Sequence, residues 1–292
     1  MKIAKVITTS FVPRVLRQES QICGEPPGYF SHSQNFVTCE SVIDLIRMNI
    51  HLEEMCDPGE DVDLIIINND SGFELGNQYL DSLDGRLLKR GKIRIFHREN
   101  YGRSFGGYSY AFMKLRNEYD YFIFTEDDII VWRDGYARKG LEVMHNHAQC
   151  GFVAYQGVGR KYKKNNVNDS IHAHGGVGLT STIVLNKVVD SYGFLPHATS
   201  NSSQSYDQII EKGEVAFTNV ISKLGFEVLE ITKETKFYDF AYDLMRNISK
   251  PRYIKGFSLI LYRVILILKN IKSSILNLIT KIKPLQNIKT PK

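Results

Sequence analysis

Short strand-like runs rich in apolar residues mark the first half of the chain, and the run over 63–67 is continuously apolar after Asp63. They cover residues 3–9, 63–67, 93–96 and 121–124, and each is long enough for a strand but short for a helix. The runs show little alternation with polar residues, which is typical of strands buried on both faces of a parallel sheet. The pattern therefore predicts a mostly parallel sheet.

Longer stretches between these runs carry apolar residues at helical spacing. They predict helices over residues 36–48, 77–88 and 108–117, so that strands and helices alternate. This alternation predicts an α/β fold, a doubly wound, mostly parallel sheet flanked by helices. Such sheets bind their ligands at the carboxyl ends of the strands.

The pattern becomes looser in the second half of the chain. The expected elements are a helix over 134–147, a strand over 151–156, a polar basic loop over 157–169, a strand over 177–185, a loop or short helix over 203–213, and a helix over 214–224. Gly225 follows the last helix, where glycine commonly ends a helix.

Polar and acidic residues follow the predicted strands. Thr8, Thr9 and Ser10 close the first strand, Asp70 follows the second, and the fourth ends on three consecutive acids, 126–128. Crowded carboxylates repel one another unless a cation lies among them. Mg²⁺ takes oxygen ligands and typically binds one or two carboxylates together with substrate phosphates. The strand ends therefore predict a phosphate-bearing substrate that is held through a metal ion.

Composition sets the class of the protein. With 292 residues, of which 43% are hydrophobic and 24% charged, the chain can bury one sizeable core. Four cysteines lack the spacing of metal sites and the density of a disulfide scaffold, and the first residues run directly into a strand rather than a signal peptide. These features predict a cytoplasmic protein with reduced thiols.

The charge of the chain is unevenly distributed. Residues 244–292 contain eleven Lys or Arg and no Asp or Glu, which leaves 26 basic against 32 acidic residues in 1–243, a net charge of −6. A tail of this kind predicts an anionic partner surface. Its apolar content favours lipid over nucleic acid.

Apolar residues of the tail recur at helical spacing. They are Phe257, Ile260, Leu261, Val264, Leu268, Ile271, Ile275, Leu278, Ile279 and Ile282. The densest run, 257–268, is shorter than the roughly 20 residues that a membrane span needs, and it contains Arg263. A basic amphipathic helix over 251–283 that lies on an anionic membrane surface fits better than a span. A helix that packs on the protein itself or on a partner remains the alternative.

Four segments of the chain carry a resemblance to a known family. They are residues 62–71, Asn100-Tyr101-Gly102 with Gly106-Gly107, Thr125-Glu126-Asp127-Asp128, and the stretch from Gly213-Glu214 to Gly225-Phe226. In this order they resemble motifs of family 2 glycosyltransferases of the GT-A fold: a second strand ending in an acid, an Asn-x-Gly segment, a DxD motif and an "ED…G-Y/F" helix.

The resemblance implies a domain organisation. Residues 1–243 would form a Rossmann-like GT-A catalytic domain, with a nucleotide-binding half over about 1–130 and an acceptor-binding half over about 131–243. Residues 244–292 would form the membrane-associating tail.

The resemblance and the residue types together predict the site. Asp128 would bind the divalent metal ion, Mn²⁺ or Mg²⁺, which neutralises the leaving pyrophosphate. The remaining donor-binding residues would be Thr8, Thr9, Ser10, Asp70, Asn100, Gly102, Arg103, Glu126 and Asp127. Of these, Glu126 is expected at the ribose, Asp127 as a support, Asp70 at the nucleobase and Arg103 at a phosphate.

Glu214 is the predicted general base, since inverting transfer needs a carboxylate to take the proton of the acceptor hydroxyl. Asp207 and Glu211 are its reserves. His172 and His174 form a His-x-His pair that fits either a metal site or a solvated loop. The first acid of the usual "ED" pair is replaced by Gly213, and Gln-x-x-Arg-Trp, which marks processive synthases, is absent.

The resulting hypothesis is a metal-dependent inverting glycosyltransferase, either a hexosyl- or an N-acetylhexosaminyl-transferase. It would move a sugar from a nucleotide-sugar donor, UDP-linked by default, to a lipid-linked saccharide in the synthesis of bacterial surface polysaccharide such as O-antigen, lipopolysaccharide or capsule. It would be peripheral on the inner face of the cell membrane and bind no nucleic acid. The alternatives are a sugar-nucleotide pyrophosphorylase and a catalytically silent binding protein. The pyrophosphorylase class should carry a Gly-rich basic loop where residues 8–13 stand here, so this class is disfavoured. The silent binding protein would be a membrane-bound protein that kept the GT-A fold.

Overall fold

The computed structural model describes residues 1–15, 36–163, 166–198, 211–231 and 236–246. Contacts divide the chain into two units, Met1–Ala241 and Tyr242–Lys292. The sheet, its covering helices and the candidate site belong to the first unit. Of the second unit only 242–246 are described, within helix α8 (Ala241–Arg246), so the predicted tail helix over 251–283 lies outside the described residues.

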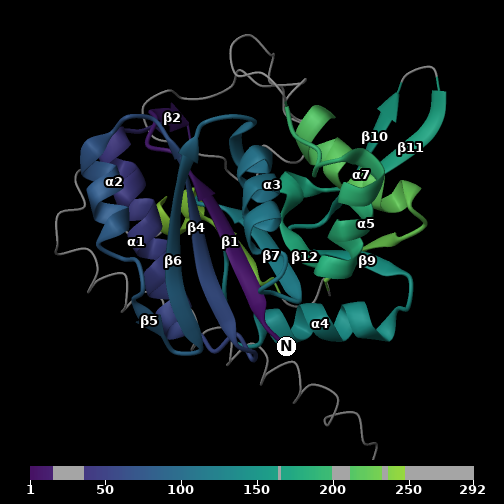
Figure 1. Cartoon of the computed structure of the whole chain (residues 1–292), viewed down its shortest axis with the longest axis horizontal. Helices are drawn as coiled ribbons and strands as arrows, with labels where there is room; N and C mark the ends of the chain where they lie inside the picture. The colour runs from purple at the N-terminus through teal and green to yellow at the C-terminus, as the bar shows by residue number, and fades with distance from the viewer. Residues whose placement is uncertain (16–35, 164–165, 199–210, 232–235, 247–292) are drawn as a thin grey trace, which may run out of the picture. The chain divides into compact units, whose positions relative to one another are not determined.

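In the described part of the chain, eight strands form the main sheet, in the order β13-β9-β12-β7-β1-β4-β6-β5 (Figure 1). The strands are β1 (Ile3–Thr9), β4 (Val62–Asp70), β5 (Leu87–Leu88), β6 (Gly91–Glu99), β7 (Tyr121–Glu126), β9 (Cys150–Ala154), β12 (Gly178–Ser181) and β13 (Glu227–Glu230). β1 runs parallel to β4 and β7, and β4 runs parallel to β6, whereas β12 runs antiparallel to β7 and β9. The predicted mostly parallel sheet is confirmed.

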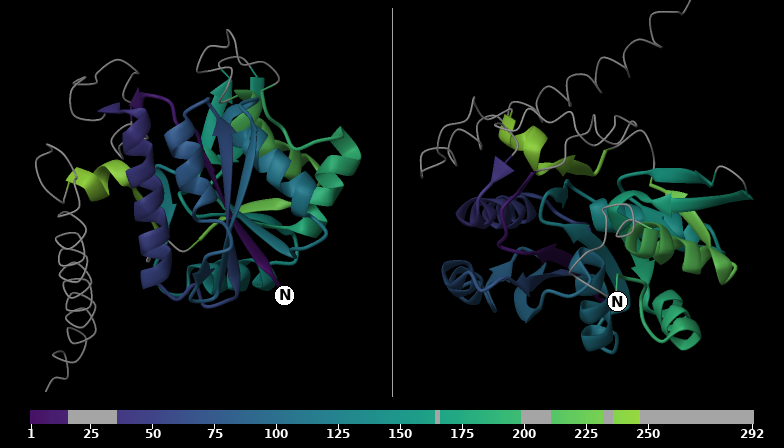
Figure 2. Two further views of the ribbon diagram at one scale, coloured as in Figure 1. Left: turned by 60° about the vertical axis from the view of Figure 1, so that its left-hand side comes forward. Right: turned by 90° about the horizontal axis from the view of Figure 1, so that it is seen from above.

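Helices cover both faces of this sheet (Figure 2). They are α1 (Cys39–Met55), α2 (Glu74–Asp81), α3 (Arg103–Leu115), α4 (Tyr136–Asn146), α5 (Thr182–Tyr192), the π-helix η3 (Glu211–Val215) and α7 (Ala216–Lys223). The smaller elements are the pair β2 (Arg14–Val15) and β3 (Phe36–Val37), the pair β8 (Ile129–Val131) and β14 (Tyr238–Phe240), the hairpin β10 (Val158–Lys163) and β11 (Asn166–Ala173), and the 3₁₀ turn η2 (His174–Gly176).

Alternate side chains of the central strands divide the core into two layers. Val6 and Ile65 point to the face covered by α3, α5 and α7, whereas Ile7 and Ile66 point to the face covered by α1 and α2. Successive side chains of a strand face opposite sides, so an unbroken apolar run serves both layers at once. This is why the central strands β1 and β4 are largely apolar.

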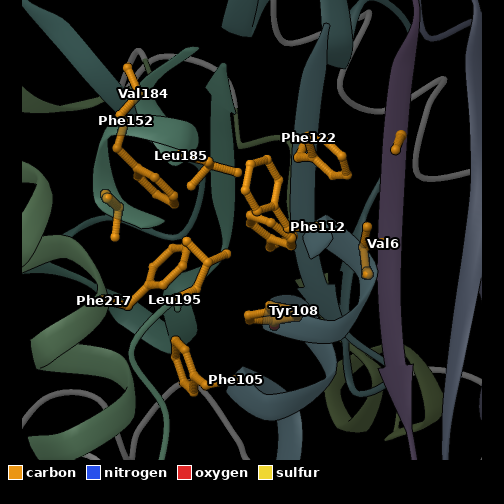
Figure 3. Packing of buried hydrophobic residues seen from close by; sticks show 14 of the residues in the cluster. Val6, Phe105, Tyr108, Phe112, Phe122, Phe152, Val184, Leu185, Leu195 and Phe217 are labelled. Atoms are coloured by element: carbon orange, nitrogen blue, oxygen red, sulfur yellow. The ribbon is translucent and has the colours of Figure 1, made fainter. Parts of the chain in front are cut away.

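Aromatic rings fill much of the layer under α3, α5 and α7 (Figure 3). The ring centroids of Tyr108 and Phe124 are 4.7 Å apart, and those of Phe105 and Phe217 are 5.7 Å apart. Phe105 comes from the first turn of α3 and Phe217 from the first turn of α7. Their contact therefore joins two helix starts that are distant in the sequence.

A charged group lies buried on the opposite face. The Lys5 ammonium is 2.7 Å from the Glu53 carboxylate and also donates to the carbonyl of Val131, and Tyr136 donates a 2.7 Å hydrogen bond to Glu53. Lys5 is fully buried and Glu53 is 3% exposed. Buried charges of this kind persist when they are paired and hydrogen-bonded. The group joins β1, α1 and the start of α4.

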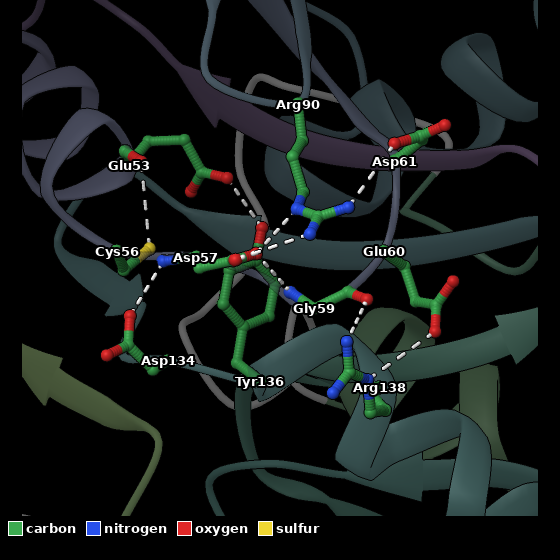
Figure 4. Close-up of polar contacts among 10 residues, drawn as sticks. All are labelled: Glu53, Cys56, Asp57, Gly59, Glu60, Asp61, Arg90, Asp134, Tyr136 and Arg138. Atoms are coloured by element: carbon green, nitrogen blue, oxygen red, sulfur yellow. Dashed lines mark hydrogen bonds and ion pairs between the residues drawn. The ribbon is translucent and has the colours of Figure 1, made fainter.

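The loop after α1 is held by polar contacts (Figure 4). The backbone N–H of Asp57 donates to Asp134 at 2.7 Å, and the Asp57 carboxylate lies 2.6 Å from Arg90. Arg138 donates a 2.7 Å hydrogen bond to the carbonyl of Gly59. These contacts fasten the loop to the starts of β6 and α4, at the end of the sheet where the parallel strands begin.

Two sequence-based element predictions are wrong in the second half. Residues 157–169 form most of the antiparallel hairpin β10–β11 rather than a loop. Residues 177–185 form the short strand β12 and then enter α5, because Ser181 caps the helix by accepting a 3.2 Å hydrogen bond from the N–H of Val184. The serine cap was hidden within a run of β-branched residues that favours strand.

The predicted helix over 77–88 is also shorter and earlier in the sequence than expected. α2 ends at Asp81, and Leu87 and Leu88 form a strand that pairs with the start of β6. Their two apolar side chains continue the helical spacing, which explains the error.

Candidate functional site

The strand order reverses between β1 and β7. From β1 the chain passes outward through β4 to β6, and then returns to β7 on the other side of β1. In open α/β sheets, ligands bind outside the carboxyl ends of the strands at such a switch point. Here these ends carry residues 8–10 on one side and 126–128 on the other, and Thr8 is paired with Glu126.

Hydrogen bonds tie the two strand ends together. The N–H of Asp127 donates to the carbonyl of Thr8 at 3.2 Å, and the Thr9 hydroxyl donates to Oδ2 of Asp127 at 2.5 Å. The Ser10 hydroxyl turns the other way and donates to the carbonyl of Asn69 at 2.8 Å. Asp127 thus joins the end of β7 to the end of the neighbouring strand β1, while its predicted part in donor binding stays a prediction.

The two aspartates of the acidic run are largely buried, whereas Glu126 is half-buried. Asn49 of α1 donates a 2.9 Å hydrogen bond to the backbone carbonyl of Asp127, and the carbonyl of Asp128 accepts one from the N–H of Ala241. The backbone around both carboxylates is therefore fixed. Adjacent buried carboxylates are costly unless hydrogen bonds or a cation stabilise their charge, so the arrangement suits a cation.

Thr8 contributes a buried hydroxyl at the same place. Its side chain is 3% exposed, and its Oγ1 has no hydrogen-bond partner in the described part of the chain. Buried polar atoms are nearly always satisfied in native proteins. An unsatisfied hydroxyl at a switch point is therefore a candidate ligand-binding atom.

Asp70 lies one strand further along this edge of the sheet and is exposed. Its Oδ1 accepts hydrogen bonds from the N–H of Gly72 at 2.8 Å and from the side chain of Asn77 at 3.1 Å. The hydrogen bond from the Gly72 backbone, followed by that from Asn77, holds the pKa of Asp70 below its usual value. The carboxylate is therefore ionised at neutral pH and caps the turn into α2.

The segment before α3 approaches the same edge. Asn100 donates to the Ser10 hydroxyl at 3.5 Å, and Asn69 donates to the carbonyl of Arg103 at 3.4 Å. Arg103 is exposed and has φ +51°, a backbone region that non-glycine residues rarely adopt. Gly102 also has a positive φ, and a Cβ there would come within 2.6 Å of the His197 ring. Outliers of this kind gather at functional sites.

A second cluster of polar side chains comes from the other half of the sheet. His172 at the end of β11, His174 in η2 and Glu214 in η3 bring ligand-type atoms within 4.8 Å of one another. Glu214 Oε1 is 3.7 Å from His172 Nε2 and 3.7 Å from His174 Nδ1. Three such residues are close enough to hold a metal ion, and we call them the His–Glu cluster.

The His–Glu cluster borders the acidic strand end. A Cβ on Gly175, the residue after His174, would lie 3.2 Å from the side chain of Ile129, the residue after Asp128. Phe105 of α3 packs against both Gly176 and Gly213, where added Cβ atoms would come within 2.6 and 2.8 Å of its ring. The cluster therefore stands beside the switch point and the first turn of α3.

The structure thus divides the predicted site residues between two groups. Residues 8–10, Asp70, the 100–103 segment and the acidic run meet at one sheet edge. Glu214 lies in the His–Glu cluster, Glu211 opens the same π-helix, and Asp207 falls outside the described residues. The hydrogen bonds that Asn49 and Asn69 donate at this edge were not predicted from the sequence. The Asn-Asn-Asp run at 68–70 was a signal that could have identified Asn69.

Within the described ranges, no helix combines the length and apolar character that crossing a membrane requires. The predicted peripheral contact depends on tail residues that lie outside these ranges.

No protein-family model and no curated protein matches the chain. Solved structures similar to it include a cytidylyltransferase from Leptospira borgpetersenii, with 12% identity, a TM-score of 0.43 and coverage of 93% of this chain and 96% of that one. A 4-diphosphocytidyl-2C-methyl-D-erythritol synthase has 11% identity and a TM-score of 0.38, covering 91% and 100%. A nucleoside-diphosphate-sugar pyrophosphorylase from Vibrio cholerae has 10% identity and a TM-score of 0.36, covering 83% and 96%.

The enzyme class predicted from the sequence is contradicted by these findings. The similar structures are nucleotidyltransferases and a sugar-nucleotide pyrophosphorylase, whereas the prediction was a glycosyltransferase, and membership of glycosyltransferase family 2 is not confirmed. The error has a physical reason. A strand ending in an acid, a glycine-rich helix start and an acidic strand end are features of the ligand-binding edge of an α/β sheet, and one fold hosts more than one reaction.

Proposed function

We propose that this chain is a metal-dependent nucleotidyltransferase of the sugar-nucleotide pyrophosphorylase type. It would bind a nucleoside triphosphate at the carboxyl ends of β1 and β7 and join its nucleotidyl group to a phosphorylated sugar. The observation that carries the proposal is the meeting of Thr8 with the Asp127–Asp128 pair at the switch point.

The cation of the proposed reaction belongs at Asp128. Asp127 already accepts the Thr9 hydrogen bond, so its carboxylate holds the end of β7 against the end of β1. Asp128 is the adjacent buried carboxylate, and Mg²⁺ or Mn²⁺ with one or two carboxylates and substrate phosphates is a common arrangement. Such an ion would neutralise charge on the triphosphate.

The neighbouring residues supply the other contacts that a nucleotide needs. The Thr8 hydroxyl is a buried donor, and Arg103 is an exposed guanidinium at the start of α3, suited to phosphate oxygens. Residues 8–13 are not the Gly-rich basic loop expected of the pyrophosphorylase class. Charge neutralisation would therefore fall to the cation and Arg103.

The reaction itself is a displacement at the α-phosphorus. An oxygen of the sugar phosphate attacks, a new P–O bond forms, the bond to the β-phosphate oxygen breaks, and pyrophosphate leaves with the electron pair. A sugar phosphate is already ionised at neutral pH, so this nucleophile needs no general base, in contrast to a hydroxyl acceptor. Positioning and charge stabilisation then carry most of the catalysis.

Two earlier expectations are separate from this proposal. The lipid-linked acceptor, and Glu214 as the base that activates it, belong to glycosyl transfer. Neither is needed for nucleotidyl transfer to a sugar phosphate. Contact of residues 251–283 with an anionic membrane surface stays a prediction from the sequence.

The test is release of pyrophosphate by the full chain. UTP, CTP, GTP, dTTP and ATP would each be supplied with a panel of sugar 1-phosphates and either Mg²⁺ or Mn²⁺. We expect release for one nucleotide, dependent on the sugar phosphate and the metal, and a fall of roughly 10²–10³-fold in Asp128→Asn, comparable to the loss of one transition-state-stabilising group. Asp190→Asn, on the exposed side of α5, is the matched control.

Two results would contradict the proposal. Metal-dependent nucleotide binding without pyrophosphate release from any pair would favour the silent binding protein. Release that is equal in Asp128→Asn and wild type would remove the acidic strand end from the reaction.

A further inference from the structure

We propose that His172, His174 and Glu214 bind one zinc ion, at a site distinct from the cation position at Asp128. The proposal goes beyond nucleotide chemistry and does not depend on it. The two sites differ in ligand type, in the elements that build them and in the metal that they favour.

The ligand set favours a transition metal. Two imidazole nitrogens and one carboxylate oxygen suit zinc, whereas Mg²⁺ prefers oxygen ligands only. Three protein ligands with a fourth position for water or a substrate oxygen are typical of catalytic zinc sites, and His₂Glu is one of the known sets. Asp128, by contrast, follows two other carboxylates in the chain, Glu126 and Asp127, and these offer oxygen ligands.

The distances within the cluster fit a shared ion. Glu214 Oε1 is 3.7 Å from a nitrogen of each histidine, which is longer than a hydrogen bond. Two ligands about 2.1 Å from a tetrahedral ion lie about 3.4 Å apart, so small side-chain movements complete this part of the site. The ligand atoms of all three residues lie within 4.8 Å of one another, so the two atoms that are furthest apart must move somewhat further to bind the same ion.

Convergence of two imidazoles on one oxygen is the strongest geometric argument. A simple ion pair needs one histidine for one carboxylate. Here both rings face the same Oε1, and they stand nearly perpendicular, with centroids 5.4 Å apart and an interplanar angle of 83°. A carboxylate oxygen and a nitrogen of each ring therefore gather at one place, as three ligands of one ion must.

The backbone around the three ligands is fixed. The N–H of Ala173, between the histidines, donates to the Thr218 hydroxyl at 3.3 Å, and that hydroxyl donates to the carbonyl of Glu214 at 3.5 Å. The N–H of His174 donates to the carbonyl of Gly157 at 3.1 Å. Thr218 thus links β11 to the helix that carries Glu214.

Glu214 lies in a π-helical turn, a rare conformation that is frequent at functional sites. Glu214 and His172 are 7% and 8% exposed, so most of the cluster is shielded from water. Shielding strengthens binding of a cation by these ligands. Exposed histidine–carboxylate pairs on a surface lack this property.

The test is titration of Zn²⁺ into the metal-free full chain by calorimetry, with Co²⁺ absorption as a report of tetrahedral nitrogen and oxygen ligation. We expect one zinc per chain, at least about 100-fold weaker binding in His172→Ala, His174→Ala and Glu214→Gln, and loss of the Co²⁺ signal. Removal of outer-shell partners alone already costs 10–100-fold. His145→Ala is the matched control, because His145 is an exposed histidine that contacts Tyr121 and does not belong to the cluster.

A thermal measurement separates ligation from folding. Zinc should raise the melting temperature of the wild type and of His145→Ala but not of the three ligand variants. If an alanine variant does not fold, His174→Asn and Glu214→Gln replace it as smaller changes. Asp128→Asn should retain zinc binding, which distinguishes this site from that of the proposed nucleotidyl transfer.

Three results would overturn the proposal. They are absence of stoichiometric zinc binding, zinc binding that is unchanged in all three ligand variants, and competition by Mg²⁺ at similar concentration.

Discussion

At the residue scale, Lys5 and Glu53 form an ion pair that is almost completely buried. Lys5 lies in the middle of an apolar strand, and its alternation places it on the α1 face of the sheet. The carboxylate of Glu53 and the carbonyl of Val131 replace the water that the ammonium loses on folding. Desolvation can exceed the gain of such a pair, but removal of one partner leaves an uncompensated charge.

The Lys5→Met variant should therefore be less stable by about 3–5 kcal/mol, because Glu53 is left buried without its cation. The double change Lys5→Met with Glu53→Gln should recover part of this loss. Urea unfolding followed by circular dichroism measures both, with the exposed Lys139→Met as control. A loss below about 1 kcal/mol in Lys5→Met would show that the pair is unimportant for stability.

Tyr119 provides a prediction for alkaline pH. Burial, opposed by the hydrogen bond from Arg94 and assisted by that to Asp63, raises the pKa of Tyr119 to about 12. Since the folded pKa exceeds the ordinary value of about 10, the fold favours the neutral phenol. The stability that this contributes is fully present below pH 10 and is lost as the pH rises from about 10 through 12.

The free energy of unfolding should therefore fall more steeply between pH 10 and 12 in the wild type than in Tyr119→Phe. Denaturant titrations at several pH values measure the difference, and the other tyrosines are common to both proteins. Parallel curves would mean that the phenol of Tyr119 titrates at its ordinary value.

At the element scale, the central strands were predictable and the outer ones were not. β1, β4 and β7 are largely apolar because helices cover both faces, and this signal is local in the sequence. The hairpin β10–β11 is held by pairing between its strands, which leaves no continuous apolar run. The short strand β12 has antiparallel partners on both sides, and only the fold brings these together.

The same reasoning explains what was found of the site. The acidic run and residues 8–10 could be predicted because strand ends of a parallel sheet meet at one edge. The His–Glu cluster could not be predicted with the same force. His172, His174 and Glu214 come from a hairpin, a 3₁₀ turn and a π-helix, and none of these elements has a periodic pattern.

Helix α3 depends on a glycine for its contact with β1. A Cβ on Gly107 would lie 2.6 Å from Cγ2 of Thr8 and 3.5 Å from Ile67. Gly107→Ala would ordinarily stabilise a helix by up to about 1 kcal/mol. Here the added methyl should push α3 away from the strand end and cost about 1–3 kcal/mol.

The Gly107→Ala change should also weaken nucleotide binding, because it displaces Thr8 and the first turn of α3 together. Thermal unfolding and nucleotide titration measure the two effects, and Met113→Ala on the exposed side of α3 is the control. An increase in stability with unchanged nucleotide affinity would contradict the close contact.

At the scale of the whole molecule, an acidic part, residues 1–243, is joined to a basic tail, residues 244–292. Removal of residues 251–292 deletes nine of the eleven tail cations and should abolish sedimentation with anionic liposomes. Wild-type binding should fall with salt, and neutral liposomes provide the control. Retention of the truncated chain on anionic liposomes would contradict the predicted membrane contact.

Several elements within residues 1–241 meet at the switch point between β1 and β7. The main sheet fixes its two strand ends, and the first turn of α3 and the adjoining His–Glu cluster lie beside them. A nucleotide held through a cation at Asp128 is the central claim, since the proposed transfer requires it.

Calorimetric titration of UTP, CTP, GTP and dTTP into the full chain, with and without Mg²⁺ or Mn²⁺, tests this claim most directly. We predict that one nucleotide binds, that its binding needs the metal, and that Asp128→Ala abolishes it while Asp190→Asn does not. Failure of every nucleotide to bind, or equal binding to Asp128→Ala, would contradict the account.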